Sequence, residues 1–180
     1  MSTSSLPISI ALDVFNLSHA GDHGILHWAR VVENGRVLAD RLGISRTLTD
    51  IFGILHDARR INEYTDRDHG IRSGALVRQL SNDGVLVLAD KGVRELEFAC
   101  CFHSTGRRDG PLLAQVCWDA DRLDLGRVGI EPNRERLCTG AAKSSEIFDW
   151  ACKRGMDCAV SNIILDEWNI RYAGGAIEVI

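Results

Sequence analysis

Apolar residues recur at helical spacing through most of this chain, and proline interrupts none of these runs. The chain has three prolines, Pro7, Pro111 and Pro132, and each lies where a periodic segment begins or breaks. Proline inside a helix removes a backbone donor and clashes with the preceding turn, so this placement leaves long helices intact. The pattern predicts an all-α fold, with helices over residues 22–42, 47–60, 66–80, 91–103, 112–125 and 134–154.

The remaining segments decide the domain organisation. Residues 85–89 form a short apolar segment, residues 104–110 a loop with two glycines, and residues 157–180 fit either extended structure or short helices. We expect one domain over residues 16–155, preceded by a leader or first helix over residues 1–15. A C-terminal extension over residues 156–180 is expected to pack on the same domain. With 180 residues, 45% of them hydrophobic, the chain can bury about 70% of the surface that its unfolded form exposes.

The charge balance limits the kinds of partner. The 21 basic and 25 acidic residues give a net charge of −4, which argues against extended nucleic acid but allows a local basic pocket for a phosphorylated small molecule.

No apolar run approaches the roughly 20 residues that cross a bilayer, and residues 1–8 lack the pattern of a signal peptide. We therefore expect a cytoplasmic protein without membrane contact, with a homo-oligomer left open. The six cysteines contain no C-x-x-C pair and are expected to be free thiols.

Imidazoles and carboxylates lie among the apolar residues of the predicted helices. Such groups lose several kcal/mol when buried without partners, so they should be paired, solvated or bound to a cation. The doublet His56-Asp57 is the clearest case because it follows the apolar run from Ile51 to Leu55. The other members of the set are His27, His69, His103 and Asp121. A histidine-rich set with two aspartates suits a transition metal, and the ligand count favours Mn or Fe over Mg.

Other polar residues receive ordinary interpretations. His19 and His23 match no pattern and are expected to be satisfied core or surface histidines. Asp119, Asp124 and Glu63 are interpreted as members of surface ion pairs rather than as groups that support a site.

The order of the histidines and aspartates resembles the HD-domain superfamily of metal-dependent phosphohydrolases, whose motif is H…HD…D. His27 begins the segment His-Trp-Ala-Arg-Val, His56-Asp57 matches the doublet, and Asp121 matches the aspartate of an Ala-Asp-x-Leu segment. The resemblance covers roughly residues 22–130. It implies an all-α HD-domain helical bundle.

The resemblance also implies a divalent metal site with Mn, Fe, Zn, Ni or Mg, and with one or two ions. Asp57 would bridge two ions, one held with His27, His56 and Asp121 and the other with His69 and His103. The implied reaction is hydrolysis of a phosphorylated small molecule, a nucleotide or cyclic nucleotide, by metal-bound hydroxide.

Within that reaction we expect catalytic roles for Asp57, Arg60 and His69. Arg30, Arg59 and Arg60 are the expected substrate-binding residues, because guanidinium groups bind phosphate through paired hydrogen bonds. Arg59 and Arg60 equally fit cations that cap a helix C-terminus. Arg122 and Lys143 are weaker candidates.

Two other functions stay open. One is a di-iron HD-type enzyme that uses oxygen, for which His69 and His103 would be essential. The other is a non-catalytic module that binds a nucleotide as a regulatory ligand or docks a partner through the C-terminal residues; a ligand would then raise thermal stability without being consumed.

Overall fold

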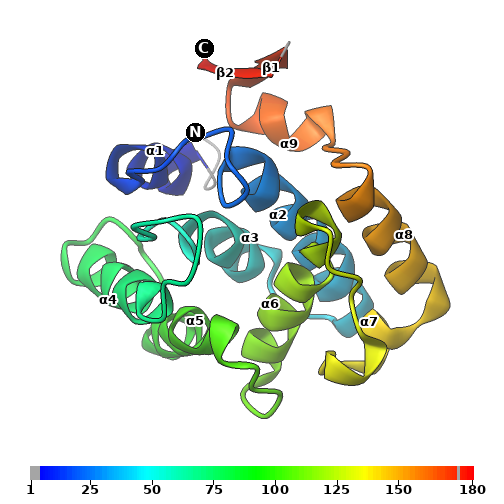
Figure 1. The fold of residues 1–180 in the computed structure, drawn as a ribbon. Helices are drawn as coiled ribbons and strands as arrows, with labels where there is room; N and C mark the ends of the chain where they lie inside the picture. The colour runs from blue at the N-terminus through cyan, green and yellow to red at the C-terminus, as the bar shows by residue number, and fades with distance from the viewer. Residues whose placement is uncertain (1–4, 174) are drawn as a thin grey trace.

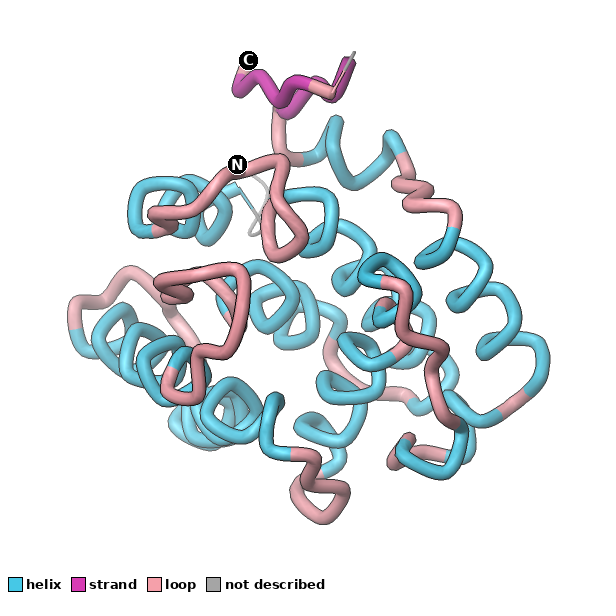
Figure 2. The backbone as a smooth tube through the Cα atoms, in the orientation of Figure 1, coloured by secondary structure: helices cyan, strands magenta, loops and turns pink. Residues whose placement is uncertain are grey.

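The computed structural model describes residues 5–173 and 175–180, and most of them are helical (Figure 1). The α-helices are α1 (Ser5–Val14), α2 (Ile25–Leu42), α3 (Arg46–Leu55), α4 (His69–Asn82), α5 (Asp90–Phe102), α6 (Leu112–Arg122), α7 (Gly140–Lys143), α8 (Ser145–Met156) and α9 (Asn162–Glu167). Short 3₁₀ turns cover His103–Thr105, Leu125–Val128 and Arg134–Arg136. Within the described residues, strands are confined to the C-terminal pair β1 (Ile170–Ala173) and β2 (Ala176–Val179) (Figure 2). The predicted all-α helical bundle is confirmed.

The core lies between α2, α3, α5 and α6, which pack side by side in the middle of the molecule (Figure 1). Its largest fully buried side chains include Trp28, Phe52 and Trp118, and the indole N–H of Trp118 donates to Ala99 O at 2.9 Å. Two glycines allow close helix contacts. A Cβ at Gly53 would lie 2.6 Å from Val32 on α2, and one at Gly74 would lie 2.3 Å from Cys101 Sγ on α5. These glycines let α3 pack closely against α2 and α4 closely against α5.

The helix predicted over residues 47–60 ends earlier, at Leu55. The chain then continues as tight turns, with Ala58 N donating to Leu55 O at 3.2 Å and Arg60 N donating to Asp57 O at 3.0 Å. The His56-Asp57 doublet therefore lies at a helix end.

The single helix predicted over residues 134–154 is wrong. The buried carboxylate of Asp119, on α6, accepts the backbone N–H of Cys138 at 2.6 Å and that of Thr139 at 2.8 Å. The Thr139 hydroxyl donates to the same carboxylate and caps α7 by accepting the N–H of Ala142. These contacts divide the segment into the 134–136 turn, α7 and α8. They also correct the interpretation of Asp119, which organises backbone instead of forming a surface ion pair.

The ends of the chain pack on the same core. In α1, Ile8 and Ala11 are buried; residues 1–4 of the predicted leader lie outside the described residues. The C-terminal residues contain both structures that the sequence allowed, α9 and an antiparallel pair in which Ile170 lies opposite Val179. Buried Leu165 and Trp168 attach this extension to the core.

All six cysteines are free thiols, as predicted. Among the helices of the described residues, none combines the length and the apolar character required to cross a membrane.

Candidate metal centre

Imidazoles from four helix ends meet around one carboxylate. His27 lies in the first turn of α2, His56 follows α3, His69 begins α4 and His103 follows α5. All four are at least 95% buried, with exposed fractions of 1%, 0%, 4% and 5% respectively. The carboxylate of Asp57, itself 3% exposed, lies between them. The fold thus brings together histidines that are widely spaced in the sequence.

The first part of this cluster contains His27, His56 and, from α6, Asp121. We call it the α2–α3 half, after the helices that carry its two histidines. The two Nε2 atoms are 3.1 Å apart, and Asp121 Oδ1 lies 3.5 Å from His27 Nε2 and 3.8 Å from His56 Nε2. Asp57 Oδ2 lies 3.7 and 3.8 Å from the same two nitrogens. Ligand atoms about 2.0–2.2 Å from a transition metal lie roughly 3–3.5 Å from one another. The spacing therefore fits one cation.

The second part, the α4–α5 half, contains His69 and His103. Their Nε2 atoms are 2.8 Å apart and lie 3.2 and 3.4 Å from Asp57 Oδ1. The two oxygens of Asp57 thus face different halves. Three overlapping sets have ligand atoms within 4.8 Å of one another: His27, His56 and Asp57; His56, His103 and Asp121; Asp57, His69 and His103. All six residues that the sequence suggested as ligands are brought together.

The hydrogen bonds of the imidazoles show that this cluster suits a cation. Each Nδ1 faces an acceptor, so the neutral ring carries its proton there and leaves a lone pair on Nε2. The acceptors are Asp124 Oδ2 for His27, Phe52 O and Gly53 O for His56, Asp66 O for His69 and Cys100 O for His103. Asp57 Oδ1 is also buried without a hydrogen-bond donor. Four lone pairs and two carboxylates that converge repel one another unless a cation lies between them.

Burial and neighbouring charges set the protonation of the cluster. Burial, aided by the charge of Arg127, lowers the pKa of His27 well below its usual value, and burial also lowers the pKa of His56. For His103 the effect of burial is outweighed by the contact with Asp57, which raises its pKa. Burial alone would raise the pKa of Asp57, but the imidazoles hold it well below its usual value. At neutral pH the α2–α3 half offers neutral imidazoles and an ionised carboxylate.

Asp124 supports His27 from behind, which corrects its interpretation as part of a surface ion pair. The side chain is fully buried, with Oδ2 2.8 Å from His27 Nδ1 and Oδ1 accepting Arg30 Nε at 2.6 Å. A carboxylate on the far nitrogen fixes the tautomer of a ligating histidine and increases its basicity. A sequence signal existed, because Asp124 follows Asp121 by three residues. Arg30 lies against Asp124 and does not line the pocket described next.

A cavity of about 500 Å³ opens onto Asp57, His69, His103 and Asp121. Four arginines line it: Arg60, Arg122, Arg127 and Arg136. The size lies within the usual range for small-molecule pockets, and the cations suit an anionic ligand. Arg127 and Arg136 were missed by the sequence reasoning, since they belong to a region without a recognised motif.

Of the two arginines that follow the doublet, Arg60 lines the pocket and Arg59 lies on the surface. Arg60 is buried, with Nη1 3.8 Å from Asp57 Oδ1 and 3.4 Å from His69 Nε2, and Nη2 donating to Tyr64 O at 2.6 Å. Arg59 is exposed and lies outside the pocket. Lys143 borders a separate, shallow hollow.

His23 is a further pocket residue that the sequence reasoning set aside. Its Nδ1 lies 2.6 Å from Glu63 Oε2, and its ring centroid lies 6.3 Å from that of His27. A carboxylate-bound imidazole at the pocket wall can exchange a proton with a ligand. The spacing of four residues between His23 and His27 was the available signal.

One solved structure with a similar fold is a crystal structure of a predicted HD superfamily hydrolase from an uncultured Thermotogales bacterium. The two chains are 25% identical, with a TM-score of 0.64 over 90% of this chain and 91% of that chain. No family model and no curated protein matches the sequence. The likeness extends over nearly the whole of both chains.

Proposed function

We propose that this chain, which has the HD-superfamily fold and its cluster of histidines and aspartates, is a metal-dependent phosphohydrolase. The structural likeness supports a hydrolase at the level of the superfamily. The finer proposal is hydrolysis of a phosphorylated small molecule, with nucleotides and cyclic nucleotides as the candidate substrates.

One observation carries the proposal: four imidazole lone pairs and two carboxylates converge on the floor of a pocket lined by arginines. Imidazole and carboxylate ligands suit Mn, Fe, Zn or Ni better than Mg. A divalent ion held there would supply hydroxide at neutral pH and neutralise charge on the phosphate oxygens.

The residues of the chain would do the rest by position and charge. Asp57 lies between the two halves and stays ionised at neutral pH because its pKa is lowered by the imidazoles. Asp124 keeps the Nε2 lone pair of His27 directed at the cluster. Arg60 borders both the cluster and the cavity, so its guanidinium can bind a phosphate oxygen of the substrate. His23 can exchange a proton at the pocket wall.

The test is an activity assay on protein purified without added metal and then loaded with Mn²⁺ or Fe²⁺. Nitrophenyl phosphate, bis-nitrophenyl phosphate, nucleoside monophosphates and cyclic nucleotides would be compared. We expect turnover that requires metal and is lost in Asp57→Asn. Failure of the metal-loaded protein to hydrolyse any phosphoester would reject the proposal.

A second candidate function is an oxygen-dependent di-iron enzyme. The two Asp57 oxygens face separate histidine pairs, which would allow two adjacent ions. Oxygen consumption together with a mixed-valence iron signal would favour this candidate. A non-catalytic nucleotide-binding module would instead show an increase in thermal midpoint with a nucleotide that is recovered intact.

A further inference from the structure

One wall of the pocket gathers arginines away from the histidine cluster. Arg122 comes from the end of α6, Arg127 from the turn that follows it, and Arg136 from the turn over residues 134–136. Asn133 and Glu131 complete this side. The whole chain has a net charge of −4, so three cations against one carboxylate are a local concentration of positive charge.

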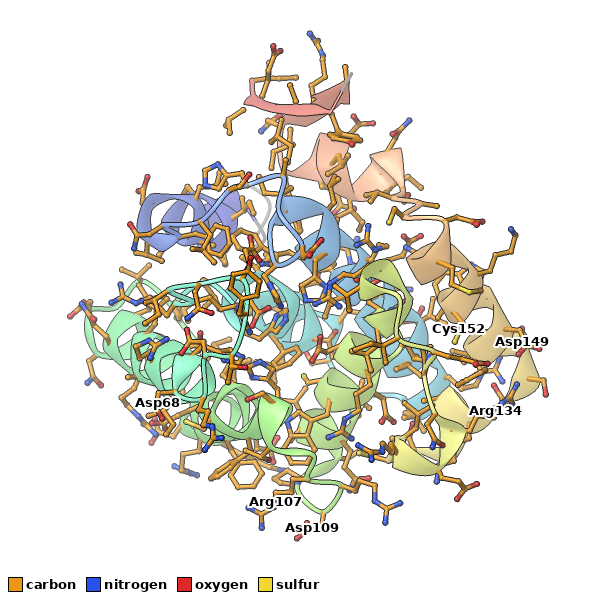
Figure 3. The ribbon with its side chains drawn as sticks, in the orientation of Figure 1. Asp68, Arg107, Asp109, Arg134, Asp149 and Cys152 are labelled. Atoms are coloured by element: carbon orange, nitrogen blue, oxygen red, sulfur yellow. The ribbon has the colours of Figure 1, made fainter. Side chains whose placement is uncertain are left out.

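Arg136 is the cation of this wall that has no protein partner. Its side chain is exposed, and its guanidinium forms no hydrogen bond or ion pair with any described residue. Arg134, two residues earlier, differs: it donates to Asp149 Oδ1 at 2.7 Å (Figure 3). Its guanidinium also stacks on the Phe148 ring. One turn therefore has a paired arginine on the α8 side and an unpaired arginine on the pocket side.

Arg122 holds this wall in place. Its Nη1 donates to Arg136 O at 3.0 Å, and its Nη2 donates to Arg107 O in the loop after α5. Asp119 anchors the next residues by accepting the N–H of Cys138 at 2.6 Å. The backbone that carries Arg136 is thus fixed before any ligand binds, which lowers the entropic cost of binding.

We infer that this wall is a second anion subsite, with Arg136 as its main ligand-binding residue. The inference rests on the proposed function: one phosphate would react at the histidine cluster, and the wall would bind a second phosphate of the same substrate. A fixed arginine turn with one unpaired guanidinium suits a phosphate, because guanidinium binds phosphate oxygens through two parallel hydrogen bonds.

The wall does not distinguish a diphosphate chain from two phosphates on one sugar. Both classes share the chemistry of two phosphate groups and fit a cavity of about 500 Å³. Glu131 on the same side would repel a phosphate but can accept a hydrogen bond from a hydroxyl group. Its presence suits a substrate with a hydroxyl-bearing portion beside the second phosphate.

The first experiment measures binding of pyrophosphate and inorganic phosphate to metal-free protein by calorimetry. Without metal, the carboxylates of Asp57 and Asp121 repel anions from the cluster, so binding reports on the wall. We expect Arg136→Gln to weaken pyrophosphate binding by about tenfold or more. The control is Arg94→Gln, which removes an exposed arginine on α5 outside the pocket. Absence of pyrophosphate binding, or equal binding by the two variants, would overturn the inference.

The second experiment separates this inference from the proposed function. With the metal-loaded enzyme, Arg136→Gln should raise KM about tenfold for ADP, for adenosine 3′,5′-bisphosphate, or for both, and leave KM for AMP unchanged. The substrate whose KM rises identifies the spacing of the two phosphates. An equal rise in KM for AMP, or no rise in KM for either bisphosphorylated substrate, contradicts the subsite. If no phosphoester is turned over, the proposed function fails, and the calorimetry still decides whether the wall binds anions.

Discussion

The two halves of the histidine cluster have similar geometry but different surroundings. In the α2–α3 half, His27 is backed by the carboxylate of Asp124, which Arg30 fixes in turn. In the α4–α5 half, both imidazoles are backed by backbone carbonyls, and the guanidinium of Arg60 lies 3.4 Å from His69 Nε2. One half thus has a carboxylate behind a ligand, with Arg30 and Arg127 on the far side of that carboxylate. The other half has a guanidinium directly beside a ligand nitrogen.

This difference indicates two metal positions of unequal affinity. A carboxylate behind a histidine strengthens it as a ligand, whereas a nearby guanidinium competes with a metal for the same lone pair. Protonation adds to the contrast, because the pKa of His27 is lowered and that of His103 is raised. Because a metal competes with protons for a ligand atom, the raised pKa of His103 weakens metal binding in the α4–α5 half as the pH falls, and the lowered pKa of His27 protects the α2–α3 half. We therefore expect the α2–α3 half to bind the first ion.

The largest effect is expected for Asp57→Asn, which removes the charge common to both halves. Both ions should be lost, and phosphoester turnover should fall by more than about a hundredfold, since even residues that only support ligands contribute 10–100-fold. Metal content by elemental analysis and kcat/KM provide the measurements. Asp68→Asn is the control, because Asp68 is exposed at the start of α4 and its side chain forms no cap (Figure 3). Retention of both ions by Asp57→Asn would refute the shared role.

Asp124→Asn tests the half that has the added carboxylate. Affinity for the first ion should fall by about 10–100-fold, and affinity for the second should change little. Competition with a metal-sensitive dye would measure both constants. The substitution also leaves Arg30 buried without its charged partner, so the thermal midpoint should fall too. If the two affinities fall equally, the halves are not supported independently.

Arg60→Gln tests the other half by removing the competing cation. The second ion should bind several-fold more tightly, while KM for a phosphoester rises because a phosphate-binding group is lost. The first ion serves as the internal control, since Arg60 contacts neither His27 nor His56. A weaker second ion would mean that Arg60 supports the metal position.

The smallest effect concerns pH and the metal-free protein. The pKa values of His27 and His56 lie below the usual value of 6.5 when folded, so the stability they contribute is present above that pH and is lost on acidification. His103 has a raised pKa and contributes in the opposite direction. In the presence of a chelator, the thermal midpoint should fall by several degrees from pH 7.5 to 5.5.

Two variants sharpen this pH test. His103→Gln should make the thermal midpoint fall more steeply between pH 7.5 and 5.5, because it removes a group whose protonation stabilises the folded state. His27→Gln should make the midpoint fall less steeply, because it removes a group whose protonation destabilises the folded state. Identical slopes in the two variants would contradict the opposite pKa shifts of His27 and His103.

The sequence predicted the helices that present one regular apolar face, such as α2, α5 and α6. It did not predict the breaks between residues 134 and 154, because the cause lies elsewhere in the chain. The carboxylate of Asp119 takes up backbone N–H groups of Cys138 and Thr139. A contact between residues so far apart in sequence leaves no trace in local periodicity.

The candidate site could be predicted where it depends on the order of residue types. It could be predicted less well where it depends on the direction in which a side chain points. His27, His56, Asp57 and Asp121 followed from the H…HD…D order, and His69 and His103 from the second ion that the resemblance implied. The helix end at Leu55 decides that Arg60 faces the pocket while Arg59 faces solvent, and the sequence placed that end several residues later. The roles of Asp124 and His23 likewise depend on which atoms they reach.

A calorimetric titration of metal-free protein with Mn²⁺ tests the central claim most directly. The claim is that the fold gathers these imidazoles and carboxylates to hold cations in two unequal positions. The account predicts two binding steps per chain with separable affinities, the tighter step weakened in Asp124→Asn and both absent in Asp57→Asn. No measurable binding, or a single step that persists in Asp57→Asn, would contradict it.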